Sequence, residues 1–316
     1  MKIDKTITLL LLFLVNCWPS VYAQSYFSYR LPSEGARLGD KLILYVNAKW
    51  LSYRHGLPLL YKPFEYSDKF MFSKLEMPYE QAKFNETTLI TWDKKPDYKN
   101  LNNVVFEVGN DPLCEYILSE INFKDSQFRA ELKKNLAPTI ELETVKPPKE
   151  CISIAVHVRK NSNGYDFPLS YEVIEKLGYL PEGTYTDLMF PLKHPSDDYF
   201  IEQIKRAFDH FGEEKFYVFI FTDDANPSAI ADKYQKALSS YKNVIFDYRR
   251  TENKHYLNVL EDMFSMANFD ALVRGESGFG FIASLIGNYK LKISPTGYHK
   301  IGHKIIIDKI SIESDF

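Results

Sequence analysis

The residues His157-Val158-Arg159 stand at the end of an apolar run that starts at Ile152. This run predicts a short buried strand. Because side chains alternate along a strand, His157 and Arg159 share one face at the strand's carboxyl end. An arginine there can bind a phosphate through two parallel, charge-assisted hydrogen bonds, and the histidine can offer a ring nitrogen to the same ligand. The alternative is a surface arginine beside a half-buried structural histidine.

Two glycine-containing loops could hold the same kind of anion, because each leads directly into a predicted helix. One loop covers Ser33–Asp40 and the other covers Gly275–Gly280. The N-terminus of a helix presents free N–H groups and a partial positive charge, which favour anions. The alternatives are ordinary turns, in which Asp40 and Ser277 only cap the following helices.

The residues Thr222-Asp223-Asp224 follow a second buried strand. An aspartate at this position of an α/β sheet often contacts a ribose hydroxyl or a base edge. The alternative is a pair of capping residues before the next helix. The chain has no CxxC pair and no HExxH segment, and its seven histidines do not cluster, so no metal site is predicted.

These groups depend on an alternation of strands and helices that begins at Cys151. The predicted strands are 152–158, 216–221, 244–246, 271–273 and 291–293, and the predicted helices are 197–211, 257–268, 278–286 and one that opens at Asn226-Pro227. Apolar strands that alternate with helices indicate a parallel sheet covered on both faces, whose ligands bind at the carboxyl ends of the strands. The first half is less regular: a helix is predicted over 40–55 and an extended piece over 57–61, while 64–100 stays unassigned.

The chain is predicted to contain a leader and two domains. Residues 1–23 have a basic start, an apolar core and a cleavage position after Ala23, which indicates a secretory signal peptide. The alternative is an uncleaved signal anchor that associates with a membrane. A proline-containing linker, 146–150, separates a domain over 24–148 from a domain over 149–316. We therefore expect a protein of the secretory pathway or an exported protein.

The amino-acid composition excludes some classes of protein. The 316 residues are 45% hydrophobic and 26% charged, which excludes a disordered chain. A net charge of −3 argues against a sequence-independent nucleic-acid binder. Aromatic residues make up 15% of the chain, which suits sugar-binding clefts and tyrosine-rich cores equally. Cys114 and Cys151 remain after cleavage, and they could form a disulfide or stay free thiols.

Four segments considered together resemble a known family: RLGD at Arg37–Asp40, HVR at His157–Arg159, FTDD at Phe221–Asp224 and SGF at Ser277–Phe279. Their order and approximate spacing resemble the α-1,2/α-1,6/protein O-fucosyltransferase superfamily, most of all its bacterial α-1,2-fucosyltransferase-like branch. The resemblance implies the glycosyltransferase B-type fold, an α/β architecture of two Rossmann-like domains facing across a cleft. It also implies GDP-fucose as the donor, inversion at the anomeric carbon without a metal or other cofactor, and a glycan or glycoprotein hydroxyl as the acceptor.

The resemblance assigns donor contacts to five residues of the second domain. Arg159 corresponds to the family arginine that holds the β-phosphate, and His157 corresponds to the donor-binding histidine of the same motif. Ser277, Gly278 and Phe279 correspond to the Ser-x-Phe turn that contacts phosphate. Negative charge grows on the departing GDP, and an arginine and helix N-termini can stabilise this charge more than they stabilise the ground state.

The remaining candidates are more weakly placed by the resemblance. Gly39 and Asp40 correspond to a Gly-Asn pair of the first-domain, donor-binding loop, with aspartate in place of asparagine. The added negative charge is repulsive to a diphosphate unless Arg37, itself a donor-binding candidate, or Lys41 offsets it. Asp223 falls near the position that touches the nucleoside. Glu34, beside the donor-binding loop, is the candidate general base, and the alternative is an exposed loop glutamate.

The chain departs from the family pattern directly after Arg159. The family usually continues with Arg-Gly-Asp-Tyr, whereas this chain has Lys160 and a longer loop, and a lysine keeps the charge but not the fork. Two other functions stay open: a transferase of the same fold that uses another nucleotide sugar, and an exported, catalytically degenerate homologue that binds a glycan or a partner. A dehydrogenase and a serine hydrolase are disfavoured, since no GxGxxG follows a strand and no GxSxG is present.

Overall fold

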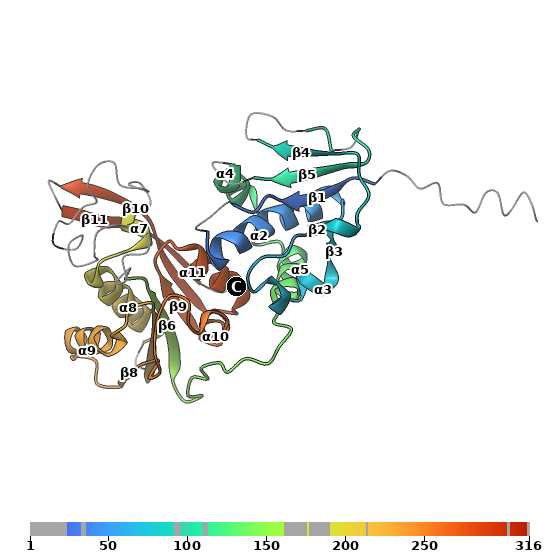
Figure 1. Cartoon of the computed structure of the whole chain (residues 1–316). Coiled ribbons are helices and arrows are strands. Elements are labelled where there is room, and N and C mark those ends of the chain that lie inside the picture. The colour runs from blue at the N-terminus through green and yellow to red at the C-terminus, as the bar shows by residue number, and fades with distance from the viewer. Residues whose placement is uncertain are drawn as a thin grey trace, which may run out of the picture. The chain divides into compact units, whose positions relative to one another are not determined.

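The structure is a computed structural model of the chain (Figure 1). It describes residues 24–32, 36–91, 96–98, 100–109, 113–160, 176, 190–212, 214–301 and 304–314. The predicted leader, residues 1–23, lies outside the described residues. Parallel strands and helices make up both halves of the chain, which confirms the predicted α/β class.

The chain forms two compact units, which are described separately below. Unit 1 comprises Met1–Ala36 and Ile43–Asn135, and unit 2 comprises Arg37–Leu42 and Leu136–Phe316. The division falls after Asn135, whereas the sequence pattern placed a domain boundary after residue 148. Helix α2 (Leu38–His55) therefore starts in unit 2 and continues in unit 1.

The segment that leads into the second half of the chain is attached to unit 2. The Val145 N–H donates to Ser265 Oγ (2.8 Å), and Asn268 Nδ2 donates to the Val145 carbonyl oxygen (3.1 Å). Ser265 belongs to helix α10 (Val259–Met266). The prolines of residues 146–150 give the pattern of a linker, but the hydrogen bonds of Val145 just before it attach the chain to unit 2.

Unit 1 is built on a three-stranded parallel sheet in the order β1–β5–β4. Its elements are β1 (Tyr26–Tyr29), β2 (Leu60–Tyr61), η1 (Ser67–Lys69), α3 (Phe72–Leu75), β3 (Met77–Pro78), η2 (Tyr79–Gln81), β4 (Glu86–Ile90), β5 (Val104–Val108), α4 (Leu113–Glu120) and α5 (Ser126–Leu136). The elements from β2 to η2 span two to four residues each, which is too short to leave a periodic pattern in the sequence.

Aromatic side chains fill the core of unit 1. Tyr45 of α2 stacks on Phe72 with 4.3 Å between ring centroids, and Tyr29 of β1 meets Tyr45 edge-on at 6.1 Å. All three side chains are fully buried, and the Tyr29 hydroxyl donates to the Lys62 carbonyl oxygen (2.8 Å). The aromatic residues of this unit therefore serve packing, which is the tyrosine-rich core that composition left open.

Unit 2 is built on a six-stranded sheet in the order β11–β10–β9–β6–β7–β8. Its strands are β6 (Ile152–Val158), β7 (Phe216–Thr222), β8 (Val244–Tyr248), β9 (Ala271–Arg274), β10 (Leu291–Ile301) and β11 (Lys304–Ser314), and its further helices are α7 (Phe190–Lys193), α8 (Asp197–Phe211), α9 (Pro227–Ala237) and α11 (Gly278–Ile286). Strands β6 to β10 are parallel, as the alternating pattern predicted. Strand β11 is antiparallel to β10 and was not predicted; register shifts between Pro295 and Tyr298 of β10 interrupt the pairing of these two strands.

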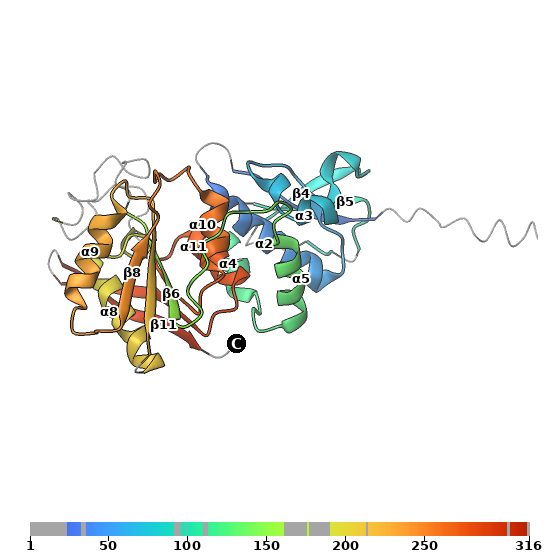
Figure 2. The same cartoon turned by 90° about the horizontal axis from the view of Figure 1, so that it is seen from below.

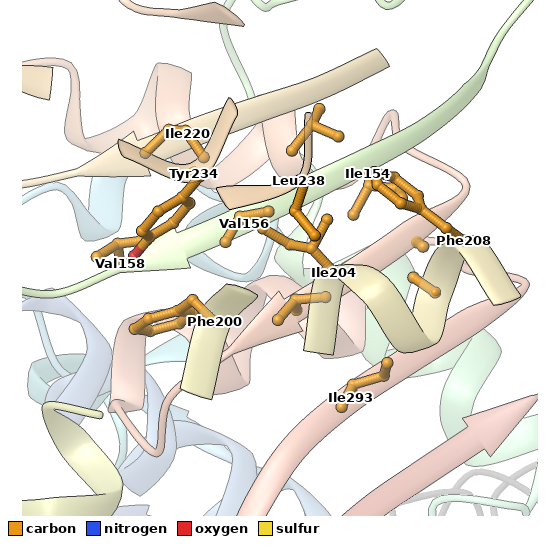
Figure 3. Close-up of a cluster of buried hydrophobic side chains, with 14 of the residues drawn as sticks. Ile154, Val156, Val158, Phe200, Ile204, Phe208, Ile220, Tyr234, Leu238 and Ile293 are labelled. Carbon is orange, nitrogen blue, oxygen red and sulfur yellow. The ribbon is translucent and has the colours of Figure 1, made fainter. Parts of the chain in front are cut away.

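Helices cover both faces of the unit 2 sheet. Figure 2 shows α8 and α9 on one side of the sheet and α10 and α11 on the other. Side chains of β6 alternate accordingly, and Ile154, Val156 and Val158 pack with Phe200 and Tyr234 in one buried cluster (Figure 3). The intervening residues of β6 point to the opposite face, which is the face that carries the chemistry described below.

Two expectations from the sequence concern membrane association and cysteine pairing. Within the described ranges, every helix is too short or too polar to cross a lipid bilayer. Cys151 carries a free thiol just before β6. The side chain of Cys114 lies outside what the structure describes, so the free thiol is established for Cys151 alone.

The buried cluster on the α8–α9 face predicts a large effect of truncation. Phe200 is fully buried, and Phe200→Ala should lower the free energy of unfolding of unit 2 by about 3–5 kcal/mol, because it leaves a cavity as well as losing apolar burial. The measurement is the urea midpoint of unit 2. Lys205→Ala, at an exposed position of the same helix, should change this free energy by less than about 0.5 kcal/mol. A loss below about 1 kcal/mol for Phe200→Ala would contradict the packing described here.

Candidate functional site

The strand order of unit 2 reverses next to β6. Strands β7 and β8 extend the sheet on one side of β6, whereas β9 and β10 extend it on the other. His157 of β6 is therefore in register with Arg274 of β9, and Arg159 and Gly275 follow these two strand ends. In open α/β sheets, ligands bind at the carboxyl ends of the strands at such a switch point. The structure places the predicted HVR segment at this position.

His157 faces the first turn of helix α11. Its ring centroid lies 5.5 Å from that of Phe279, and its Nδ1 lies 3.4 Å from Ser277 Oγ. A Cβ atom on Gly280 would come within 2.8 Å of His157 Nδ1, so this glycine lets the helix approach the ring. Three predicted residues from two distant segments, His157, Ser277 and Phe279, thus lie together.

The imidazole of His157 is neutral at physiological pH. Burial lowers its pKa to about 4, the positive charge of Arg274 also lowers it, and the negative charge of Asp223 acts in the opposite direction. A neutral ring can donate one hydrogen bond and accept one. His157 can therefore orient a ligand or the α11 turn, while the positive charge of the site comes from elsewhere.

Ser277 caps helix α11, as the alternative interpretation of the sequence proposed. Its Oγ accepts a hydrogen bond from the Gly280 N–H (3.1 Å). Capping satisfies one of the free N–H groups at the start of a helix and leaves the others of the first turn. Capping by Ser277 is therefore compatible with an anion at the N-terminus of α11.

The first turn of α2 lies against the first turn of α11. A Cβ atom on Gly39 would come within 2.4 Å of the Phe279 backbone nitrogen and 2.6 Å of the Gly278 carbonyl carbon. Only glycine allows two backbones to approach so closely. Two helix N-termini thus meet here, and their like partial charges repel unless an anion or a carboxylate offsets them.

Asp40 supplies one such carboxylate. Helix α2 begins at Leu38, so Asp40 is its third residue and not the capping residue that the alternative interpretation assumed. The exposed Asp40 carboxylate accepts a hydrogen bond from the Arg37 N–H (3.2 Å), which is half of a capping box. This contact closes the start of α2.

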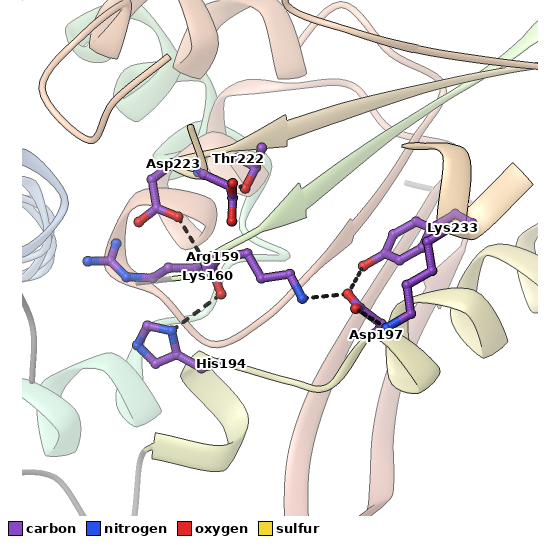
Figure 4. Close-up of polar contacts among 9 residues, drawn as sticks. Arg159, Lys160, His194, Asp197, Thr222, Asp223 and Lys233 are labelled. Atoms are coloured by element: carbon purple, nitrogen blue, oxygen red, sulfur yellow. Dashed lines mark hydrogen bonds and ion pairs between the residues drawn. The ribbon is translucent and has the colours of Figure 1, made fainter. Parts of the chain in front are cut away.

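Two side chains, from Asp223 and His194, contact the backbone of the segment that follows β6. Asp223 Oδ1 accepts a hydrogen bond from the Lys160 N–H (2.8 Å), and His194 Nδ1 lies 3.3 Å from the Arg159 carbonyl oxygen (Figure 4). Arg159 is 9% exposed. Asp223 therefore stands at the carboxyl end of β7 as predicted and uses one oxygen to hold the residues after β6, while its contact with a nucleoside stays a prediction.

Lys160 does not point towards the same side as Arg159. Its ammonium group donates to Asp197 Oδ1 (2.6 Å), and Figure 4 shows the two side chains pointing in opposite directions. The lysine that replaces the second arginine of the family motif is thus committed to a buried ion pair with α8. Arg159 points away from Lys160 (Figure 4), and Arg274, whose guanidinium lies 5.7 Å from the Phe281 ring centroid, places a second arginine next to α11.

Sequence reasoning missed the segment Leu192–Pro195, which packs on the turn after β9. The Glu276 N–H donates to the Leu192 carbonyl oxygen (2.7 Å), and a Cβ atom on Gly275 would come within 2.9 Å of Pro195 Cδ. His194 of this segment is buried beside Arg159. No periodic pattern marks this segment, and nothing in the sequence places it near β6.

Two further polar residues were missed. Arg274, buried at the end of β9, donates to the Gly275 carbonyl oxygen (3.0 Å) and pairs with Glu276 (3.1 Å). It could have been found, because an arginine ends this apolar strand just as Arg159 follows β6. Asn253 Nδ2 donates to the carbonyl oxygen of Asp224 (2.7 Å) and fixes the loop after β7, and no motif indicates this role.

Two predictions remain, the general base Glu34 and the absence of a metal site. Glu34 lies outside the described residues, so its role as a general base stays a prediction. Among the residues that the structure describes, no group of three or more histidine, cysteine, aspartate or glutamate side chains could hold a metal ion.

The sequence matches no protein-family model and no curated protein. The structure is similar to that of FUT1 from Arabidopsis thaliana, a point mutant in complex with GDP, with a TM-score of 0.50 and 11% identity over 92% of this chain and 74% of that one. It is also similar to the fucosyltransferase NodZ from Bradyrhizobium (TM-score 0.42, 13% identity, 92% and 99% of the two chains) and to a NodZ α-1,6-fucosyltransferase co-crystallised with GDP (0.41, 14%, 92% and 98%). The likeness to FUT1 shows that the chain has the glycosyltransferase B-type fold, as predicted.

The neutral state of His157 predicts a pH-dependent stability. Below the ordinary histidine pKa of about 6.5, the unfolded chain takes up a proton at this position and the folded chain does not until about pH 4. Folding therefore loses up to about 3 kcal/mol through His157 as the pH falls from 7 to 4. The variant His157→Gln has no such group to titrate. The free energy of unfolding of wild type minus that of the variant, measured with urea, should therefore be lower at pH 4 than at pH 7 by up to about 3 kcal/mol.

A wild-type-minus-His157→Gln difference that stays constant from pH 7 to pH 4 would show that His157 is not held neutral.

Proposed function

We propose that the protein is an inverting, metal-independent glycosyltransferase that moves fucose from GDP-fucose to a hydroxyl of a glycan or a glycoprotein. One observation carries this proposal. Arg159 directly follows β6 at the switch point of the unit 2 sheet, where His157 meets the first turn of α11, and the first turn of α2 lies against that same turn. Three sources of positive charge at one strand edge suit a diphosphate better than a neutral ligand.

The chemistry follows from where the charge develops. When the bond from the sugar to GDP breaks, negative charge accumulates on the β-phosphate. The Arg159 guanidinium and the α11 N–H groups that Ser277 leaves unbonded bind this charge more strongly in the transition state than in the ground state. In the proposed function these groups do the work that a metal ion does in other transferases.

Different observations support the choice of donor and the choice of family branch. A GDP complex is what the FUT1 structure contains, and this chain shares the fold of that protein. The four sequence segments that resemble the fucosyltransferase superfamily supply the choice of fucose. Membership of the bacterial α-1,2 branch is part of the proposal and rests on those segments alone.

The acceptor side of the reaction is proposed from the sequence. Glu34 is the candidate base for the acceptor hydroxyl, because it lies two residues before Ala36 and thus close in the chain to the Gly39 turn. A cation-like transition state needs little help from a base, so its loss should slow the reaction less than the loss of Arg159. The leader predicted over residues 1–23 supports the proposal of an exported or secretory compartment, with membrane association if it is not cleaved.

The test is calorimetric titration of the protein with GDP and GDP-fucose in the presence of EDTA. Wild type should bind both nucleotides with micromolar affinity, because the proposed site uses no metal. Arg159→Ala should weaken binding of both by at least about 100-fold, since it removes a bidentate, charge-assisted contact. Arg206→Ala, at an exposed arginine of α8, is the matched control and should bind as wild type does.

Each other outcome points to a different function. Binding of a different nucleotide sugar with the same dependence on Arg159 would contradict the fucose assignment and identify a transferase of the same fold. Failure of the folded wild type to bind any nucleotide would overturn the proposal and favour a catalytically degenerate glycan- or partner-binding protein.

A further inference from the structure

We propose that Asp197 is a positioning residue, which acts through Lys160 to hold Arg159 in the orientation that binds phosphate. The proposal rests on the proposed function and adds to it a residue that no sequence motif indicates. Asp197 is the first residue of α8, on the opposite face of the sheet from α11. It does not need to touch the nucleotide to act on it.

The Asp197 carboxylate collects three donors. Lys160 Nζ and the Tyr234 hydroxyl donate to Oδ1 at 2.6 and 2.7 Å, and Lys233 Nζ donates to Oδ2 at 2.6 Å. The side chains of Lys160 and Asp197 are only 6% and 7% exposed, whereas that of Lys233 is 52% exposed. The buried Lys160–Asp197 pair is therefore the inner contact, and it joins the end of β6 to α8.

The stability of the fold gives no sufficient reason for this pair. Burying two charges costs desolvation energy that offsets most of their attraction, and apolar residues of similar size commonly stabilise a protein as well or better. The pair borders the buried cluster, since Tyr234 of that cluster donates its hydroxyl hydrogen to Asp197. A buried ion pair at this place is better explained by the geometry that it imposes.

The geometry concerns the peptide unit between Arg159 and Lys160. Its N–H is held by Asp223, its carbonyl oxygen lies beside His194, and the Lys160 side chain is anchored by Asp197 (Figure 4). Side chains of successive residues in an extended segment point to opposite faces. Anchoring Lys160 on the α8 side therefore keeps Arg159 directed to the other side, where α11 begins.

Preorganisation of Arg159 has a measurable consequence. A long side chain that is already oriented loses less conformational freedom when it binds. Without the anchor, contact with the β-phosphate should weaken, while contacts with the rest of the nucleotide should not. The ratio of GDP affinity to GMP affinity reports this difference, because GMP lacks the β-phosphate.

The experiment compares the binding of GDP and GMP by wild type, Asp197→Asn and Lys160→Met. Both variants should lower the GDP-to-GMP affinity ratio by about three- to tenfold, the size expected for the ordering of one long side chain. Lys160→Met leaves Asp197 bonded to Lys233 and Tyr234, so it provides a variant that should fold even if Asp197→Asn does not. Circular dichroism at the titration temperature checks that each variant is folded.

Asp270→Asn is the matched control. Asp270 is also a carboxylate bonded to β6, but it accepts hydrogen bonds from Ser153 at the strand's other end (3.0 Å from the N–H and 2.8 Å from Oγ) and pairs with Lys290. The variant Asp270→Asn should lower the free energy of unfolding without changing the ratio of GDP affinity to GMP affinity.

The outcomes separate this inference from the proposed function. An unchanged ratio in folded Asp197→Asn and Lys160→Met, or an equal loss of affinity for both nucleotides, would overturn the positioning role while wild-type binding of GDP still supports the proposed function. Absence of GDP binding by wild type would overturn both. A lowered ratio in both variants, with none in the control, supports the role of Asp197.

Discussion

The contact of Gly39 with the first turn of α11 is the constraint on which the rest of the site depends. It brings two helix N-termini together, and a side chain at Gly39 would collide with backbone atoms of Gly278 and Phe279. The same contact explains why residues 37–42 belong to unit 2 although the helix that they start continues in unit 1. Like partial charges at the two termini leave a position suited to an anion, and Arg159 points away from the Lys160–Asp197 pair on the α8 side (Figure 4).

Strand β6 divides the two tasks of unit 2 between its two faces. On one face, Ile154, Val156 and Val158 pack against α8 and α9, and on the other His157 meets α11. The alternation continues past the strand, so that Lys160 is anchored in the structural face and Arg159 is directed to the site. Strict alternation lets one strand hold a rigid core and present charged groups a few ångströms away from it.

The sequence predicted the elements of unit 2 far better than those of unit 1. Apolar strands and amphipathic helices of ordinary length leave periodic patterns, so α8 was predicted with its observed bounds, Asp197 and Phe211. The elements between Leu60 and Gln81 leave none, because each spans only two to four residues. Among the site residues, the motif placed Arg159 and Ser277 at the right strand edge. His194 and Asp197 could not be predicted, since their roles arise only when segments distant in sequence meet.

The crystal structure of the protein with GDP is the most direct test of the central claim that the unit 2 switch point binds a diphosphate. The account predicts β-phosphate oxygens within about 2.7–3.1 Å of the Arg159 guanidinium and of N–H groups in the first turn of α11. A diphosphate bound elsewhere on the protein, with Arg159 and the α11 turn uninvolved, would contradict it.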